Sequence, residues 1–260
     1  MKAYALDIKI ILGLLILGIS MLGNQLAQAQ FDSSSNETGT NDTSSQTKIT
    51  SELNSISDAR SVYETGTMSV PATVKSFIIM IPDEAHHPPG DDKTISPKNP
   101  NFLPTTLEAL DGTEIAFVHG DPSHTHVEIV RDKEGNVAWE TIPVEHPGGS
   151  DTKALSSSGS PFSISDKEFA NMKGQINISP VKSTGSLTVG GFFVPTKDLD
   201  KYKSEFAEAG FNVLSSFDFS TESVQKDLSG ENTLLIYSTS QPLKAAIEKL
   251  LPLMEALPYK

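Results

Sequence analysis

Apolar and polar residues alternate over short stretches between residues 72 and 178, with turn residues separating the stretches. The first stretch, from Val74 to Ile81, is rich in β-branched and aromatic residues and stops at Pro82. Turn sequences such as Asp111-Gly112 separate the later ones. Further strands are predicted near residues 101–110, 114–118, 124–131, 137–144, 162–165 and 174–178. Many short strands without a strong helical pattern predict an all-β sandwich over residues 70–180.

The pattern changes near Ser183, where longer amphipathic stretches begin to alternate with strands. Strand-like residues 187–194, 211–219 and 233–238 are separated by two stretches with apolar residues on one helical face, 196–209 and 242–251. The order β-α-β-β-α predicts a small α+β domain over residues 185–258. Two details are also predicted: Gly190-Gly191 forms a bulge, and Pro252 kinks or ends the second helix.

The amino-terminal residues have the pattern of an export signal followed by a linker. Lys2 and Lys9 precede an apolar run, and Ala27-Gln28-Ala29 matches a small-residue cleavage site. We therefore expect residues 1–29 to be a signal peptide, with an uncleaved membrane anchor as the alternative. The Ser/Thr/Asn-rich residues 30–66 are expected to be a disordered linker, with a short weak helix within residues 49–66 as the alternative for its last part. A secreted or cell-envelope location, with no membrane span after cleavage, follows from this reading.

Composition narrows the function classes. The formal net charge is −13, which disfavours nucleic acid as a partner. The chain has no cysteine, so disulfides and thiolate chemistry are excluded, and stability must come from buried cores. Nucleophile-elbow, phosphate-loop, dinucleotide-binding and zinc-protease motifs are also missing. We therefore expect a binding protein and not an enzyme.

Histidine is the residue type with the most suggestive distribution. His124 and His126 would point to the same face if Thr125 lies in a strand, and two imidazoles on one face can share a copper, zinc or nickel ion. His119 precedes them across the turn sequence Gly-Asp-Pro. A His-x-His pair also arises by chance, so ordinary surface histidines are the alternative interpretation.

The remaining histidines lie in loops. His86 and His87 are adjacent in a loop that also contains carboxylates, and they could complete a metal site or simply be solvated. His146 stands beside Pro147 with no evident partner, and we interpret it as a surface residue.

Three stretches of the predicted sandwich resemble the cupredoxins, the plastocyanin- and azurin-type copper proteins. They resemble in particular the small exported copper proteins of ammonia-oxidising archaea. The stretches are residues 79–85 (IMIPDEA), 102–117 (FLPTTLEALDGTEIAF) and 172–178 (MKGQINI). The resemblance implies a cupredoxin-like sandwich whose first ligand histidine is His124 or His126. It also implies that the loop carrying His86 and His87 lies near the same end.

The chain departs from the family at the position of the copper thiolate. Family blue-copper sites have a cysteine and a second histidine before the methionine, whereas residues 162–172 read FSISDKEFANM. The chain is similar to a subgroup without that cysteine, with Gly-Asp followed by His-x-His and a similar carboxy-terminal domain. A blue-copper centre depends on a copper–thiolate bond and is therefore excluded.

Two hypotheses remain open at this point. The first is an extracytoplasmic copper-handling or storage protein that binds Cu(II), with zinc as the alternative metal. Its ligands would be His124 and His126, with His86, His87 or His119 as the third. The second is a metal-free cell-envelope module whose carboxy-terminal domain contacts an envelope protein. A copper oxidase or reductase ranks below both, because no acid, base or nucleophile accompanies the histidines.

Overall fold

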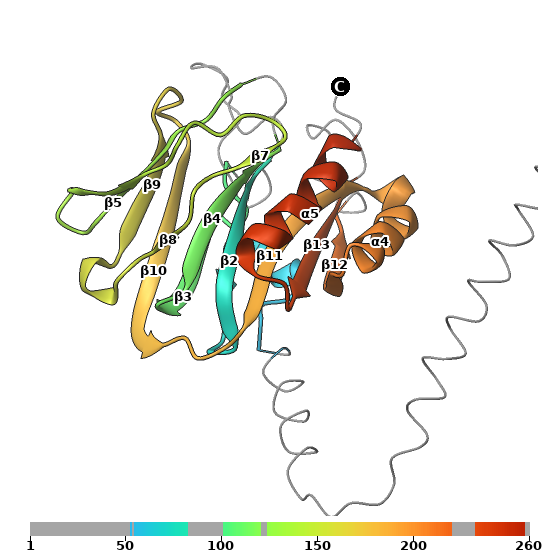
Figure 1. The fold of residues 1–260 in the computed structure, drawn as a ribbon, viewed down its shortest axis with the longest axis horizontal. Coiled ribbons are helices and arrows are strands. Elements are labelled where there is room, and N and C mark those ends of the chain that lie inside the picture. Colours follow the sequence, from blue (N-terminus) through green and yellow to red (C-terminus); the bar gives the residue numbers. More distant parts are fainter. Residues whose placement is uncertain (1–52, 54, 83–100, 121–123, 220–231, 258–260) are drawn as a thin grey trace, which may run out of the picture. The chain divides into compact units, whose positions relative to one another are not determined.

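The computed structural model describes residues 53, 55–82, 101–120, 124–219 and 232–257 (Figure 1). These residues belong to one compact unit, Thr47–Lys260. Its helices are α3 (Ala59–Thr65), α4 (Leu199–Glu208) and α5 (Leu243–Glu255), with 3-10 turns at Ser157–Gly159 and Thr196–Asp198.

The strands fall into two sheets. In chain order they are β1 (Thr67–Ser69), β2 (Val74–Ile81), β3 (Thr106–Asp111), β4 (Glu114–His119), β5 (Glu128–Arg131), β6 (Val137–Glu140), β7 (Gly148–Gly149), β8 (Lys153–Ala154), β9 (Phe162–Asp166), β10 (Lys173–Lys182), β11 (Leu187–Pro195), β12 (Asn212–Asp218) and β13 (Asn232–Thr239).

The first sheet has six strands in the order β1-β3-β10-β9-β5-β6. Strands β9 and β5 are antiparallel, and their register places Glu128 opposite Asp166. The second sheet has seven strands in the order β12-β13-β11-β2-β4-β7, with β8 also paired to β4. The two sheets pack face to face, so the predicted β-sandwich is confirmed.

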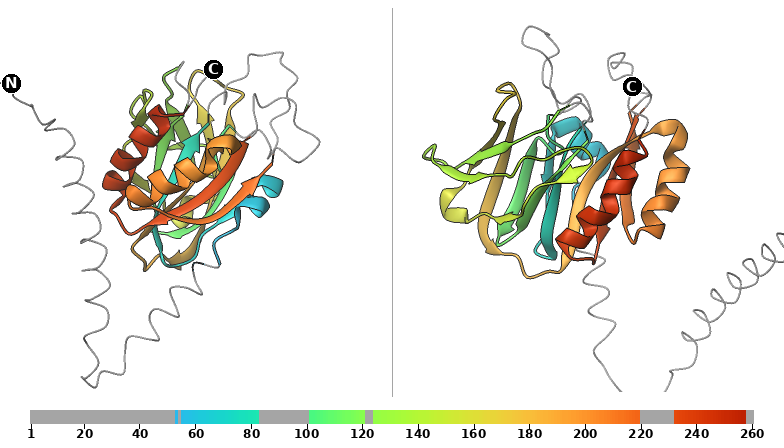
Figure 2. Two further views of the ribbon diagram at one scale, coloured as in Figure 1. Left: turned by 90° about the vertical axis from the view of Figure 1, so that its right-hand side faces the viewer. Right: turned by 45° about the horizontal axis from the view of Figure 1, so that its top comes forward.

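The carboxy-terminal elements follow the predicted order β-α-β-β-α, but their strands belong to the second sheet of the sandwich. Strand β11 pairs in parallel with β2, and β13 pairs with both β11 and β12. Figure 2 shows α4 and α5 together on the outer face of this sheet. One sheet therefore contains strands from both residues 70–180 and residues 185–258.

A single hydrophobic cluster joins the sandwich to the carboxy-terminal elements. It includes Phe117 and Trp139 from the sandwich and Phe206 and Tyr237 from the carboxy-terminal part. The rings of Phe117 and Trp139 lie 5.4 Å apart between centroids, and those of Phe206 and Tyr237 are also 5.4 Å apart. A continuous core of this kind predicts cooperative unfolding of the two parts.

At both chain ends of this unit the structure differs in part from the sequence-based prediction. Residues 59–65, expected within a disordered linker, form helix α3, which is capped by Asp58 and ends at Gly66 in the left-handed conformation. Tyr63 of this helix stacks on Phe219 at 4.9 Å between ring centroids. Helix α5 continues past Pro252 to Glu255, because Leu253 and Met254 bury their side chains there. The expected signal peptide, residues 1–29, lies outside the described residues.

The Gly190-Gly191 pair does not form the predicted bulge. Both glycines pair regularly with β13, and the irregularity in the pairing with β2 falls between Leu187 and Thr188. Gly190 is required for close packing instead. A Cβ atom there would lie 2.4 Å from Tyr237 Oη and 3.0 Å from the Ile78 carbonyl oxygen.

We therefore expect Gly190→Ala to destabilise the protein by about 1–3 kcal/mol, since overpacking forces the neighbours to move. Urea denaturation measures this loss. Ser216→Ala, at an exposed position of strand β12, is the control and should change the unfolding free energy little. A Gly190→Ala variant as stable as the control would contradict the packing assigned to this strand.

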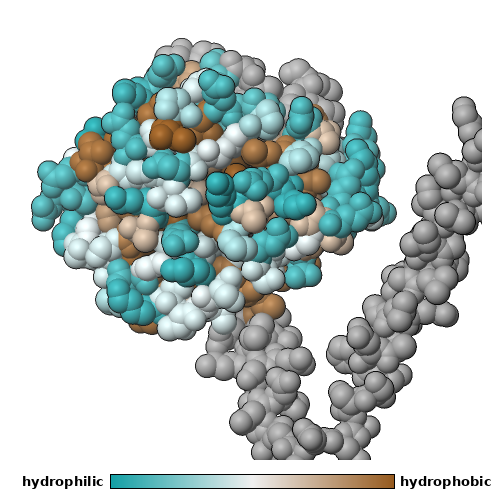
Figure 3. All heavy atoms as spheres, viewed as in Figure 1, coloured by the Kyte–Doolittle hydropathy of each residue, from teal (hydrophilic) through white to brown (hydrophobic). Residues whose placement is uncertain are grey.

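The visible surface is mainly polar. Figure 3 shows apolar residues on this face in small, separate groups among polar ones. The most exposed large apolar side chains of the described residues, Val137, Ile142 and Val181, are scattered along the sequence. Scattered apolar residues are ordinary on a protein surface and do not define a docking site. No described helix has the length and apolar character needed to cross a membrane.

Candidate metal centre

Three strand ends bring ionisable side chains together at one end of the sandwich. His119 is the last residue of β4 in the second sheet, and Asp166 is the last residue of β9 in the first sheet. Glu128 begins β5, opposite Asp166. His126 lies just before β5, where its backbone forms an isolated bridge with Val144. All four of these ionisable side chains are buried, so the cluster lies within the protein.

His126 and Asp166 form the centre of this cluster. His126 Nδ1 lies 2.9 Å from Asp166 Oδ2, and both side chains are fully shielded from solvent. Asp166 Oδ2 also accepts a hydrogen bond from the Val127 backbone N–H at 3.2 Å. Asp166 Oδ1 accepts from the backbone N–H groups of Glu168 and Phe169, each at 2.7 Å. These contacts hold the carboxylate and the imidazole in a fixed orientation.

The hydrogen bonds at Asp166 also determine its charge. Burial alone would raise the pKa of this carboxyl group. The hydrogen bonds from His126, Phe169 and Glu168 outweigh burial and hold the pKa below its ordinary value. Asp166 is therefore an ionised carboxylate at neutral pH.

His119 and His146 lie on the other side of His126. The ring centroids of His119 and His126 are 4.4 Å apart, and those of His119 and His146 are 6.1 Å apart. His146 Nδ1 is 2.9 Å from the carbonyl oxygen of His119, which fixes the position of that ring. His146 is half-buried, so its interpretation as a surface residue is only partly right. The cluster thus has three neighbouring imidazole rings, with His119 next to both His126 and His146.

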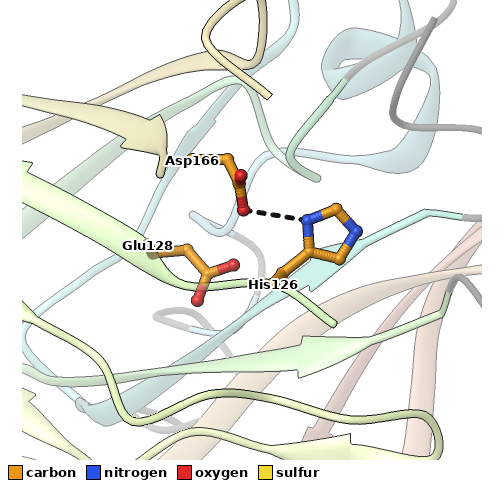
Figure 4. A group of neighbouring side chains, drawn as sticks. All are labelled: His126, Glu128 and Asp166. Carbon is orange, nitrogen blue, oxygen red and sulfur yellow. Dashed lines mark hydrogen bonds and ion pairs between the residues drawn. The ribbon is translucent and has the colours of Figure 1, made fainter. Parts of the chain in front are cut away.

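Glu128 is a buried carboxyl group behind His126. Its Oε2 accepts a hydrogen bond from the Thr141 hydroxyl at 3.0 Å, and its Oε1 has no partner among the described residues. Burial raises the pKa of Glu128 to about 7, against the lowering effect of the Thr141 hydrogen bond and of nearby His126. Figure 4 shows the side chains of His126, Glu128 and Asp166 converging. One ligand atom from each lies within 4.8 Å of the others.

The structure brings only some of the sequence-predicted ligands together. His126 and His119 are neighbours, as just described. His124 is half-buried, and its ring packs on Phe169 at 5.1 Å between centroids. Phe169 also contacts the ring of His126, at 5.3 Å. Thr125 does not lie in a strand, although the rings of His124 and His126 both contact Phe169. His86 and His87 lie outside the described residues.

Sequence reasoning missed both carboxylates of the cluster. Glu128 follows His124 and His126 at the same two-residue spacing, and this periodicity was the available signal. Asp166 lies in residues 162–172, where the cupredoxin resemblance leads one to expect a cysteine and a histidine and not a carboxylate. Its contact with His126 spans 40 residues of sequence, and only the pairing of β5 with β9 produces it.

The metal-ligand atoms present, imidazole nitrogens and carboxylate oxygens, suit a divalent metal ion of intermediate hardness. Imidazole nitrogen suits copper, zinc and nickel, and carboxylate oxygen can complete or support such a site. No thiolate is available, because the chain has no cysteine. Buried histidine next to a buried carboxylate is also the arrangement that orients histidine ligands in many metal sites.

Comparisons with known proteins give partial structural likenesses. No protein-family model matches the sequence, and no curated protein matches it either. A novel purple cupredoxin from Nitrosopumilus maritimus is 17% identical over 39% of this chain and 98% of that chain, with a TM-score of 0.32. Rusticyanin from Thiobacillus ferrooxidans is 13% identical over 51% of this chain and 93% of that chain, with a TM-score of 0.32.

A mutant of amicyanin in its Cu(I) form is 6% identical over 40% of this chain and 83% of that chain, with a TM-score of 0.28. The three likenesses cover between 39% and 51% of this chain. At these TM-scores they carry no argument about function, which depends on the cluster itself.

Proposed function

We propose that the protein is an extracytoplasmic copper-binding protein that holds Cu(II) through histidine nitrogens, for copper handling or storage. His126 and His119 are the first two ligands, and His124, His86 and His87 are the candidates for a third. Zinc is the alternative metal. The site is not a blue-copper centre, because it has no thiolate.

The observation that carries this proposal is the buried His126–Asp166 pair with the His119 ring at 4.4 Å from His126. Burying imidazole and carboxylate groups away from water costs free energy, which metal coordination can offset. Two imidazoles held this close, one of them oriented by a carboxylate, are a suitable start for a Cu(II) site with nitrogen and oxygen ligands.

Two sequence features support the remaining parts of the proposal. The resemblance to cupredoxins favours copper over other borderline metals. The apolar run before Ala27-Gln28-Ala29 favours an extracytoplasmic location. We propose no reaction for the site, because no constellation of acid, base and nucleophile accompanies these residues in the described part of the chain.

A copper titration of the metal-free protein tests the proposal. A ligand that binds only the folded state at about 100 times its Kd stabilises that state by about 2.7 kcal/mol. For a protein of this size we expect Tm to rise by about 5–10 °C, since each kcal/mol shifts it by about 2–4 °C. Equilibrium dialysis should give one copper per chain, and zinc should bind at the same site.

The double variant His119→Ala/His126→Ala is the matched test of the ligands. It should remove the stoichiometric copper and the rise in Tm, whereas His124→Ala reports separately whether His124 takes part. If the wild-type protein binds neither copper nor zinc, the proposal is wrong, and the alternative of a metal-free cell-envelope module is favoured. Copper binding that survives in the double variant would place the metal elsewhere.

A further inference from the structure

The described residues offer two places for an ion beside His126. One lies between His126, Glu128 and Asp166, whose potential ligand atoms are within 4.8 Å of one another. The other lies beyond the opposite ring nitrogen, Nε2. Figure 4 shows this nitrogen facing away from both carboxylates. Which place is used depends on which nitrogen of His126 carries the proton.

The hydrogen bonds of Asp166 decide this question. A carboxylate is an acceptor with about four lone-pair sites. Backbone N–H groups of Val127, Glu168 and Phe169 occupy three of these sites, and His126 Nδ1 occupies the fourth. Because an ionised carboxylate can only accept, Nδ1 must be the donor, and the Nδ1–H tautomer follows. In the neutral ring the lone pair is then on Nε2.

The same contacts argue against an ion that lies between His126, Glu128 and Asp166. An ion there would have to displace the proton on Nδ1 and compete with the backbone donors for the oxygens of Asp166. Glu128 would have to turn away from Thr141 or bind through its second oxygen. An ion at Nε2 leaves every one of these hydrogen bonds intact.

We propose that Asp166 is a positioning residue that fixes His126 in the Nδ1-protonated form, so that the metal binds at Nε2 and Glu128 is not a ligand. The second part of this inference, that the metal binds at Nε2, rests on the proposed metal-binding function. The tautomer itself is a property of the metal-free protein and is independent of metal binding.

Nitrogen-15 NMR of the histidine rings in the full mature chain tests both halves, with zinc as the diamagnetic probe. In the metal-free protein we expect the His126 signals of a protonated Nδ1 and an unprotonated Nε2. On addition of zinc the Nε2 signal should shift while the Nδ1–H signal persists. Loss of the Nδ1–H signal on zinc binding would overturn the inference, and so would an Nε2–H tautomer in the metal-free protein.

Two variants supply an independent readout. In Asp166→Asn the side-chain oxygen can still accept from Glu168 and Phe169, but the amide group presents a donor to His126 Nδ1. This should shift the proton to Nε2 and weaken zinc binding by about 10- to 100-fold, the range seen when such supporting carboxylates are changed. Asp166→Glu, which keeps an acceptor, should restore part of the affinity.

Glu128→Gln is the matched control, because it neutralises the other carboxyl group of the cluster. The inference predicts a much smaller loss of zinc affinity for this variant than for Asp166→Asn, because only a nearby charge and no ligand is removed, and a loss as large as that of Asp166→Asn would overturn it. If the wild type binds no zinc, the proposed function fails, while the tautomer of the metal-free protein still decides the role of Asp166. The wild-type NMR experiment needs no variant, so it stays decisive even if Asp166→Asn does not fold.

Discussion

Replacing His126 by alanine should destabilise the metal-free protein by about 3–5 kcal/mol, the range for removing the partner of a buried charge, here the Asp166 carboxylate. His126 and Asp166 are both fully shielded from water and lie 2.9 Å apart. The variant would leave the Asp166 carboxylate buried with only backbone donors. It would also remove the ring that packs between His119 and Phe169.

A double-mutant cycle separates the pair from simple loss of packing. Urea denaturation of His126→Ala, Asp166→Ala and the double variant gives the interaction energy directly. We expect the double variant to be clearly more stable than the sum of the single losses implies, because the second change removes a charge that the first has stranded. Strictly additive losses would show that the two side chains do not act as a pair.

The second large effect is a loss of stability with rising pH caused by Glu128. Its pKa is raised to about 7 in the folded protein, whereas the ordinary value is 4.5. The folded state therefore holds a proton that the unfolded state releases between these values, so stability falls as the pH rises through this window. At about 1.4 kcal/mol per pKa unit, the fall amounts to about 3 kcal/mol by pH 8 or so.

Glu128→Gln should remove this dependence, because the amide is neutral at every pH and can still accept from Thr141. The difference in unfolding free energy between Glu128→Gln and the wild type should grow by about 2.5 kcal/mol from about pH 5 to about pH 8. Urea denaturation of metal-free protein measures it. Asp166 does not contribute in this window, because its pKa lies below the ordinary value. A pH-independent difference would contradict the burial of an ionisable Glu128.

An exposed glutamate provides the control for this experiment. Glu145 is exposed and follows Val144, whose backbone pairs with His126. Glu145→Gln should leave the pH dependence of stability as it is in the wild type, since the Glu145 side chain is exposed to water in the folded state as it is in the unfolded state. A similar effect in both variants would assign the pH dependence to net charge and not to Glu128.

Local patterns in the sequence predicted most of the strands and both carboxy-terminal helices. A β-rich apolar run ended by Pro82 identified β2, and it is nearly continuous because the strand is buried on both faces. Helix α3 was expected only as a weak helix within residues 49–66, because its surroundings have a linker composition. Its signals were nevertheless present in Asp58, which caps the helix, and in Gly66, which ends it.

Non-local pairing could not be predicted in the same way. Hydropathy shows that β11 is a strand but not that it pairs in parallel with β2, more than 100 residues earlier, and so joins two expected domains into one sheet. The candidate site has the same limitation. His126 and His119 were recognisable from their types and spacing, whereas Asp166 becomes a partner of His126 only through the register of β5 and β9.

Pulsed electron paramagnetic resonance of the one-to-one Cu(II) complex tests the central claim most directly, because it detects imidazole nitrogens bound to copper. We predict the modulation pattern of at least two imidazoles in the wild type. Each of the changes His119→Ala and His126→Ala should remove one imidazole from the pattern. A Cu(II) complex without imidazole modulation, or with a pattern that neither change alters, would contradict the assignment of this buried cluster as a metal centre.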